Sequence, residues 1–213
     1  MDFLKHLTFI NYFIFFSLFY VVFQLNYKSK IHLVLFLIIS VSLINEFYNV
    51  YLITEKKDQF WNNNAFVLLN QILWYGLFSM VLNKKRLFLL LFSIFSTFSI
   101  FMYLKYNVLT EFIFEIFIFG AVIYVSFFLI FSFLRLKNEE ITFFTSNHFI
   151  IISAPLLFFI GTSLIFSFRN DNLAKFVILN NISFYTFITY FVNIIYYSLI
   201  NIYIYKERRP KNV

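Results

Sequence analysis

The chain has 213 residues, of which 62% are hydrophobic, 25% aromatic and 13% charged, and its formal net charge is +7. Too few of these residues are polar to cover the surface of a water-soluble domain of this size, so the composition excludes a soluble protein. It predicts an integral membrane protein that forms a single domain, residues 1–213. The absence of cysteine excludes disulfide bonds, thiolate metal ligands and cysteine nucleophiles.

Seven segments are long and apolar enough to cross a membrane as helices, which takes roughly 20 residues for about 30 Å of hydrocarbon. Their apolarity is continuous rather than alternating, which favours helices over a lipid-facing barrel. The first begins close to the N-terminus without a small-residue cleavage site, so we expect a membrane helix and not a removed signal peptide. The fold class is therefore predicted to be all-α, a polytopic seven-transmembrane-helix bundle. In chain order the predicted spans are residues 9–25, 31–53, 64–82, 87–104, 112–134, 149–168 and 182–205.

The Lys and Arg residues predict the orientation, because cytoplasmic loops of membrane proteins are enriched in them. Seven spans place the termini on opposite sides, and the larger share of the cations falls on the side of the C-terminus. We therefore expect a cytoplasmic C-terminus and an external N-terminus in a bacterial inner membrane. This bias accounts for the positive charge without a nucleic-acid partner. The cations on the expected cytoplasmic side are Lys28, Lys30, Lys84, Lys85, Arg86, Arg135, Lys137, Lys206, Arg208, Arg209 and Lys211.

Glu46 is an acidic residue inside the second predicted span, in the stretch LINEFYNVYL. At 1.5 Å per residue it lies about 12 Å below the outer boundary, and Gln71 on the third span lies about 10 Å below it. An ionisable group at this depth normally faces protein or water rather than lipid. Because burying it in a membrane costs free energy, its presence suggests a functional role. We therefore expect Glu46 to point into the bundle. Its candidate partners are Asn70, Gln71 and Asn193.

Polar side chains form a stripe on one face of the second predicted helix and another on the seventh, so each stripe is expected to face protein. Glu115 lies near the outer end of the fifth span, within reach of outer water. The amides have an alternative role, since such groups also join membrane helices by hydrogen bonds worth about 0.6–2 kcal/mol. The candidate ligand-binding or proton-responsive residues are Glu46, Asn45, Asn49, Asn70, Gln71, Glu115, Asn193 and Tyr197.

Pro155 and Gly161 are the candidate hinge of the sixth span, because proline removes a backbone donor and glycine permits close packing. A simple kink is the alternative. The three histidines lie in separate segments, which disfavours a metal site. The seventh span has no lysine for a retinal Schiff base, and neither G-x-S-x-G, H-E-x-x-H nor a Gly-rich phosphate loop occurs. We therefore expect no enzymatic activity, cofactor or metal.

Four stretches carry a resemblance that spans nearly the whole chain: FWNNNAFVLLNQILWYGLF (60–78), EFIFEIFIFGAVIY (111–124), SAPLLFFIGTSLIFSF (153–168) and ITYFVNIIYYSLINIYIY (188–205). In them the chain resembles small uncharacterised seven-helix proteins of Bacteroidota-type bacteria. The chain departs from these proteins at two places: Trp74–Gly76 stands where they tend to have a glutamate, and Thr189 stands where a histidine is expected. The resemblance therefore does not support a His–Glu pair in this chain. The shared features are the Asn-rich start of helix three (Asn62 to Asn64), Glu115, Gly161, and Asn193 with Tyr197.

The resemblance implies a membrane sensor or accessory component, because such genes often lie beside sensor histidine kinases. Our leading hypothesis is accordingly a sensory or signalling-accessory protein with a polar pocket in the outer half of the bundle. A ligand or proton there would repack helices two, three, five and seven, and the short basic loops would pass the change to a partner kinase. The alternatives are a small-solute or proton-coupled transporter, which the lack of recognisable repeats disfavours, and a structural membrane subunit.

Overall fold

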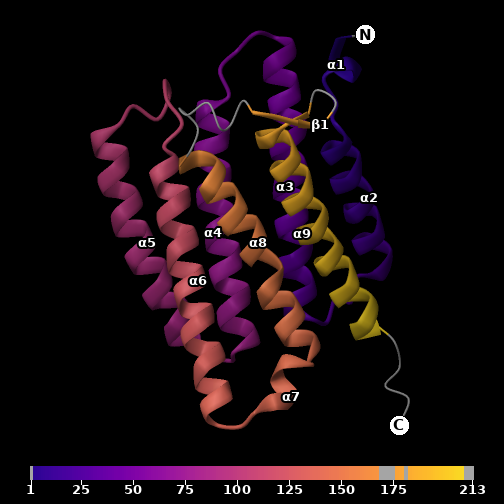
Figure 1. Ribbon diagram of the computed structural model, residues 1–213, viewed down its shortest axis with the longest axis vertical. Helices are drawn as coiled ribbons and strands as arrows, with labels where there is room; N and C mark the ends of the chain where they lie inside the picture. The colour runs from indigo at the N-terminus through magenta and orange to yellow at the C-terminus, as the bar shows by residue number, and fades with distance from the viewer. Residues whose placement is uncertain (1, 168–175, 180–181, 209–213) are drawn as a thin grey trace.

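The computed structural model describes residues 2–167, 176–179 and 182–208, and its architecture is a helical bundle (Figure 1). Continuous runs of apolar residues form the long helices, since a helix satisfies all its backbone hydrogen bonds internally. Two short strands, β1 (Val177–Leu179) and β2 (Ile182–Ser183), pair antiparallel before the last helix. The helices are α1 (Asp2–Lys5), α2 (Phe9–Gln24), α3 (Lys30–Thr54), α4 (Phe60–Val81), α5 (Lys85–Lys105), α6 (Phe114–Lys137), α7 (Ile141–Phe144), α8 (Asn147–Ser167) and α9 (Phe184–Arg208).

Within the described residues, six helices are long and apolar enough to cross a membrane: α3, α4, α5, α6, α8 and α9. The predicted all-α fold is thereby confirmed, and the six long apolar helices agree with a polytopic membrane protein. The helix α2 is apolar but has only 16 residues. At 1.5 Å per residue it spans about 24 Å, which is less than the thickness of the hydrocarbon layer.

The helix boundaries lie within about one turn of the predicted spans, and the largest difference concerns α4. Its predicted start at residue 64 is too late, because the helix begins at Phe60 and includes Asn62 and Asn63. Polar residues end a hydropathy window, but they continue a helix when protein surrounds them. Ile182 and Ser183, predicted to be helical, lie in β2. Residue 168, the predicted end of the sixth span, lies outside the described residues.

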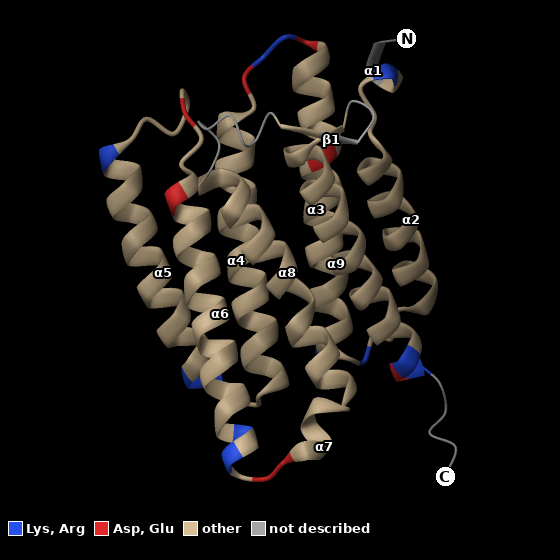
Figure 2. Ribbon diagram, viewed as in Figure 1, with Lys and Arg blue, Asp and Glu red and all other residues tan. Residues whose placement is uncertain are grey.

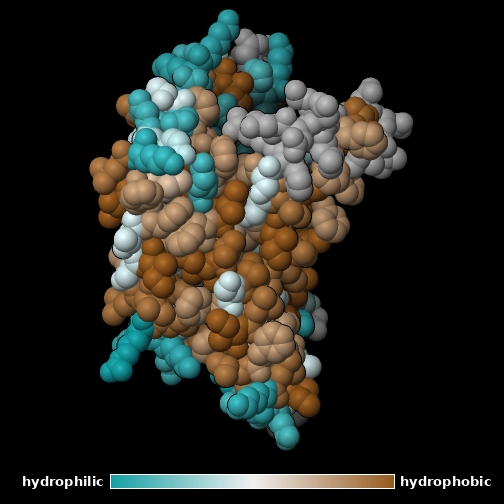
Figure 3. Space-filling view, turned by 60° about the vertical axis from the view of Figure 1, so that its left-hand side comes forward, coloured by the Kyte–Doolittle hydropathy of each residue, from teal (hydrophilic) through white to brown (hydrophobic). Residues whose placement is uncertain are grey.

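The surface of the bundle has an apolar belt between two polar ends (Figure 3). Charged residues gather at these two ends (Figure 2). Large hydrophobic side chains in the belt are exposed, among them Phe16, Phe101 and Phe133, which are each more than 60% accessible. Water would not solvate a continuous apolar belt of this kind, so lipid is its natural solvent.

Aromatic side chains fill the centre of the bundle and join its helices by hydrogen bonds. Trp74 on α4 donates its indole N–H to the hydroxyl of Tyr196 on α9, with 2.8 Å between Nε1 and the oxygen. The hydroxyl of Tyr75 donates to the carbonyl of Gly120 on α6 at 2.9 Å. These polar groups are fully buried but satisfied, which membrane interiors require. The largest fully buried aromatic side chains are Trp74, Tyr75, Phe78, Phe95, Tyr124, Phe159, Tyr196 and Tyr203.

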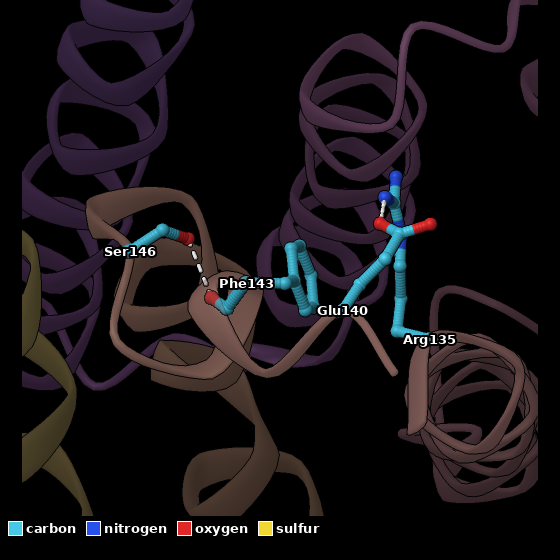
Figure 4. Close-up of polar contacts among 4 residues, drawn as sticks. All are labelled: Arg135, Glu140, Phe143 and Ser146. Atoms are coloured by element: carbon cyan, nitrogen blue, oxygen red, sulfur yellow. Dashed lines mark hydrogen bonds and ion pairs between the residues drawn. The ribbon is translucent and has the colours of Figure 1, made fainter. Parts of the chain in front are cut away.

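A compact turn connects α6 to α8 at the end of the bundle opposite the N-terminus (Figure 4). Arg135 forms an ion pair with Glu140, and its guanidinium lies over the ring of Phe143, 5.1 Å from the centroid. The hydroxyl of Ser146 donates to the carbonyl of Phe143 at 2.6 Å and accepts from the amide of Phe149 at 3.2 Å. Ser146 therefore caps the start of α8, and the turn has a defined shape.

Candidate functional site

A cavity of about 770 Å³ lies at the end of the bundle where α3 ends and α4 begins. The side chains of His6, Lys57 and Asp58, all exposed, line it and place its mouth at the surface. Residues from α2, α3, α4, α6, α8 and α9 form its wall. A smaller cavity of about 130 Å³ adjoins it and shares Glu46 and Asn193 with it.

Glu46 lies in the wall of both cavities, and its partner is Asn11 on α2. The Asn11 side chain donates from Nδ2 to Oε2 of Glu46 at 3.3 Å. Asn11 is itself held in place, because its Oδ1 accepts hydrogen bonds from the backbone N–H and the hydroxyl of Thr8, both at 2.6 Å. Thr8 caps the N-terminus of α2, so this cap also aims the Asn11 amide group at the carboxylate.

Four asparagines join α3 to α4 beside the mouth of the cavity. Asn62 donates from Nδ2 to the side-chain oxygens of Asn45 and Asn49, each at 2.9 Å. Asn49 in turn donates to Oδ1 of Asn63 at 2.8 Å. Asn45 and Asn49 lie one turn apart on the same face of α3, and Asn62 and Asn63 belong to the first turn of α4. The network holds the two helix ends together and positions three cavity-lining amides, those of Asn45, Asn49 and Asn63.

The opposite wall of the cavity comes from α8 and α9. Asn193 lines both cavities, and its side chain donates from Nδ2 to the backbone carbonyl of Thr189 at 2.8 Å. Tyr197, one turn further along α9, is buried and lines the smaller cavity together with Ser42. Phenyl rings complete the wall. They belong to Phe60, Phe66, Phe112, Phe117, Phe158 and Phe166.

The structure corrects the expected partners of Glu46. Asn70 and Gln71 line neither cavity, and Gln71 points toward α6, where a Cβ added to Gly120 would lie 2.9 Å from its Nε2. Asn62 in the first turn of α4 bonds to Asn45 on α3, next to Glu46, and Gln71 lies nine residues, about 13 Å, further along α4. Gln71 is therefore deeper in the bundle than Glu46. Asn193 shares the cavity wall with Glu46, but its amide bonds to its own helix.

The remaining predicted residues have distinct places. Glu115 lies in the first turn of α6, half-buried, and lines neither cavity. Within the described residues, Asn70 Oδ1 and both polar atoms of the Gln71 side chain are buried without a hydrogen-bond partner. Pro155 is buried inside α8, which continues past it to Ser167. Gly161 lies against α9, where an added Cβ would come within 2.5 Å of Val192 Cγ1.

Sequence analysis missed Asn11 and left Asn62 out of the site, although each carries a signal. Asn11 stands three residues after Thr8, which is the position where a polar side chain completes a capping box. Asn62 belongs to three consecutive asparagines at the start of α4. These signals did not identify the site, because a polar residue on a membrane helix indicates a contact with another helix but not which helix it contacts.

The site combines two carboxylates, Glu46 in the wall and Asp58 at the mouth, with several amides, hydroxyls and phenyl rings, so it is suited to binding a small ligand. Among the described residues, no group of three or more His, Cys, Asp or Glu side chains could hold a metal ion. Comparisons with protein-family models, with curated proteins and with solved structures find no match to this chain. The function is therefore argued from the geometry of the site.

Proposed function

We propose that this chain is a seven-span sensory or signalling-accessory protein of the bacterial inner membrane, which binds a ligand from the outer side. The seventh span is α2, which packs between α3 and α9. Its outer face carries Phe16, Phe19 and Phe23, all more than half exposed, as expected of side chains in lipid. Local thinning of the bilayer or flanking polar residues accommodate a short span.

The observation that carries the proposal is a cavity open at one end above a packed aromatic centre. The cavity reaches the surface at the N-terminal end. Trp74, Tyr75, Tyr124 and Tyr196, each at most 1% exposed, fill the middle of the bundle. A ligand that only binds needs access from one side, whereas a transported solute also needs a second conformation in which this centre opens toward the other side. The arrangement therefore favours sensing over transport.

The contact between α8 and α9 is the proposed route from the cavity to the cytoplasmic end. Gly161 of α8 packs against Val192 of α9, and each is followed directly by a cavity residue, Thr162 or Asn193. A ligand pressing on this wall changes the packing of two helices that run to the opposite end. There α8 joins the structured turn that contains Arg135, and α9 ends in basic residues. The cytoplasmic loops are too short for a kinase, so we propose a sensor histidine kinase as the partner chain.

Site-specific photocrosslinking in native membranes tests this proposal. A photoreactive amino acid at Arg86 or Lys137, both exposed at the proposed cytoplasmic end, is expected to capture a histidine kinase. The same probe at Lys105, at the other end of α5, is the matched control and is expected to capture none. Capture of no kinase from either cytoplasmic position contradicts the signalling role.

Transport is tested separately with proteoliposomes. Candidate solutes are expected to bind without net uptake, because the aromatic centre blocks a path through the bundle. Uptake that Glu46→Gln abolishes and Glu115→Gln preserves identifies the chain as a transporter and overturns the sensory proposal.

A further inference from the structure

The Glu46 carboxyl group lies in the wall of a large cavity and, among the described residues, forms no ion pair; the basic side chains of His6 and Lys57 line the same cavity at its mouth. The ion pair found among the described residues joins Arg135 to Glu140 at the other end of the bundle. Glu46 receives a single amide hydrogen bond, from Asn11 to Oε2. Glu46 is half-buried in a cavity that opens to the surface, so a cation that enters the cavity can pair with the carboxyl group. The wall therefore presents an acidic group to a bound molecule.

We propose that the cavity binds a small organic cation, an alkyl- or arylammonium ion whose charged head pairs with Glu46 and whose apolar body contacts the phenyl rings. This inference rests on the proposed function, because it names the ligand class of the same cavity.

The polar groups beside Glu46 match an ammonium head. An ammonium ion donates hydrogen bonds and accepts none, so it needs acceptors. Asn193 donates one hydrogen bond from Nδ2 to the carbonyl of Thr189, which leaves its Oδ1 as an acceptor. Asn11 donates from Nδ2 to Glu46. The Glu46 carboxyl group and the Asn193 oxygen thus lie in one wall and can both accept hydrogen bonds from a cationic head.

The rings beside Glu46 match the apolar body of such a ligand. Phe66, Phe158 and Phe166 line both cavities together with Glu46. Aromatic faces attract cations through their quadrupole, most strongly where water is excluded, and they also bury hydrocarbon. An inorganic cation requires several oxygen ligands around it, whereas the part of the wall that both cavities share places three phenyl rings with Glu46. The combination of an acid with several rings therefore favours an organic cation over a metal ion.

Binding to the full-length protein in lipid nanodiscs tests the ligand class. The probes are hexylammonium, 2-phenylethylammonium and benzyltrimethylammonium, each compared with a neutral alcohol and a carboxylate of similar carbon skeleton. Isothermal titration calorimetry and the thermal midpoint are measured on the wild-type protein, Glu46→Gln and the matched control Glu115→Gln. Glutamine at position 46 keeps the shape and the acceptor for Asn11 but removes the charge. We expect at least one ammonium probe to bind the wild type and Glu115→Gln about tenfold or more tightly than Glu46→Gln.

The proposed ligand class is wrong if no ammonium probe binds, or if an alcohol or carboxylate binds as well as its ammonium counterpart. It is also wrong if Glu46→Gln binds the ammonium probes as tightly as the wild type does. Stabilisation of the wild type by sodium ions through Glu46, in place of the organic probes, overturns it as well. The thermal midpoint of Glu46→Gln without probe shows whether the variant is folded, and Asn193→Ala provides a second variant if it is not. If the ammonium probes do not bind, the ligand class is wrong, but the photocrosslinking test of the sensory role is unaffected. If a solute is taken up into proteoliposomes, the sensory role is wrong, but the preference for cations is unaffected.

Discussion

Asn64 shows how one polar residue organises a loop at the residue scale. It is buried on α4, and its Nδ2 donates to the carbonyls of Val108 and Glu111, at 3.2 and 3.0 Å. Its Oδ1 accepts from the buried backbone N–H of Ile113 at 3.0 Å. The segment between α5 and α6 thus satisfies its backbone groups through a neighbouring helix. A polar residue in an apolar span therefore has a structural role here, unlike Glu46, whose surroundings leave it accessible to a ligand.

Replacing Asn64 by alanine is expected to lower the free energy of unfolding by about 2–3 kcal/mol, because it leaves the Ile113 N–H and two carbonyls without their partner. Denaturant titration of the purified protein in detergent measures the change. Thr110→Ala, at an exposed position of the same loop where the hydroxyl makes only a 3.4 Å hydrogen bond to the Asn107 carbonyl, is the control and is expected to stay within about 0.5 kcal/mol of the wild type. Equal effects of the two substitutions contradict this role of Asn64.

Helix pairs in this bundle are held by two kinds of contact at the element scale. The ends of α3 and α4 are joined by the asparagine network around Asn62. The contact of α8 with α9 includes instead a small residue, since Val192 and Ile188 pack directly against Gly161. Without a hydrophobic effect between helices in lipid, close packing and hydrogen bonds are the remaining sources of association.

Gly161→Ala is expected to reduce stability by about 1–3 kcal/mol, because the new methyl group would lie 2.5 Å from Val192 Cγ1 and the branched valine has little freedom to move. Gly76→Ala is the matched control. Its methyl group would lie 3.8 Å from Phe88, an ordinary contact, and alanine favours the helix by about 1 kcal/mol over glycine. Thermal unfolding of both variants measures the difference, and a Gly161→Ala protein as stable as Gly76→Ala rules out tight packing at this point.

The link between α3 and α4 is measurable as a coupling energy. A double-mutant cycle with Asn62→Ala and Asn49→Ala is expected to give about 0.5–2 kcal/mol of coupling, because Asn62 donates directly to Asn49. A second cycle pairs Asn62→Ala with Asn70→Ala, which lies two turns further along α4, and is expected to be additive within about 0.5 kcal/mol. Additivity in both cycles contradicts a network that joins the helices.

At the scale of the whole molecule, charged and apolar residues occupy separate regions of the surface. The charged residues gather at the two ends, and most of the surface between them is apolar (Figures 2 and 3). The cavity lies at the N-terminal end, whereas the basic ends of α6 and α9 lie at the other. If the basic end is cytoplasmic, as the enrichment of Lys and Arg predicts, the cavity faces outward.

Single-cysteine labelling tests the seven spans and their orientation, and the chain has no cysteine to interfere. In intact cells whose outer membrane has been made permeable, a membrane-impermeant maleimide is expected to react with Leu4→Cys and Lys105→Cys. Lys28→Cys and Lys85→Cys are expected to react only after the inner membrane is opened. Labelling of Leu4→Cys and Lys28→Cys from the same side shows that α2 does not cross, and the reverse pattern overturns the orientation.

The sequence by itself determined the membrane class, the all-α fold and the approximate ends of the helices. These three features follow from long apolar runs, which must be either buried or exposed to lipid and which form helices there. It also placed Glu46 with Asn45, Asn49 and Asn193, which line one cavity. Only the tertiary structure decided that Asn11 contacts Glu46 and that Gln71 faces Gly120. Such partners depend on the rotation and depth of helices distant in sequence, and packing between them sets both.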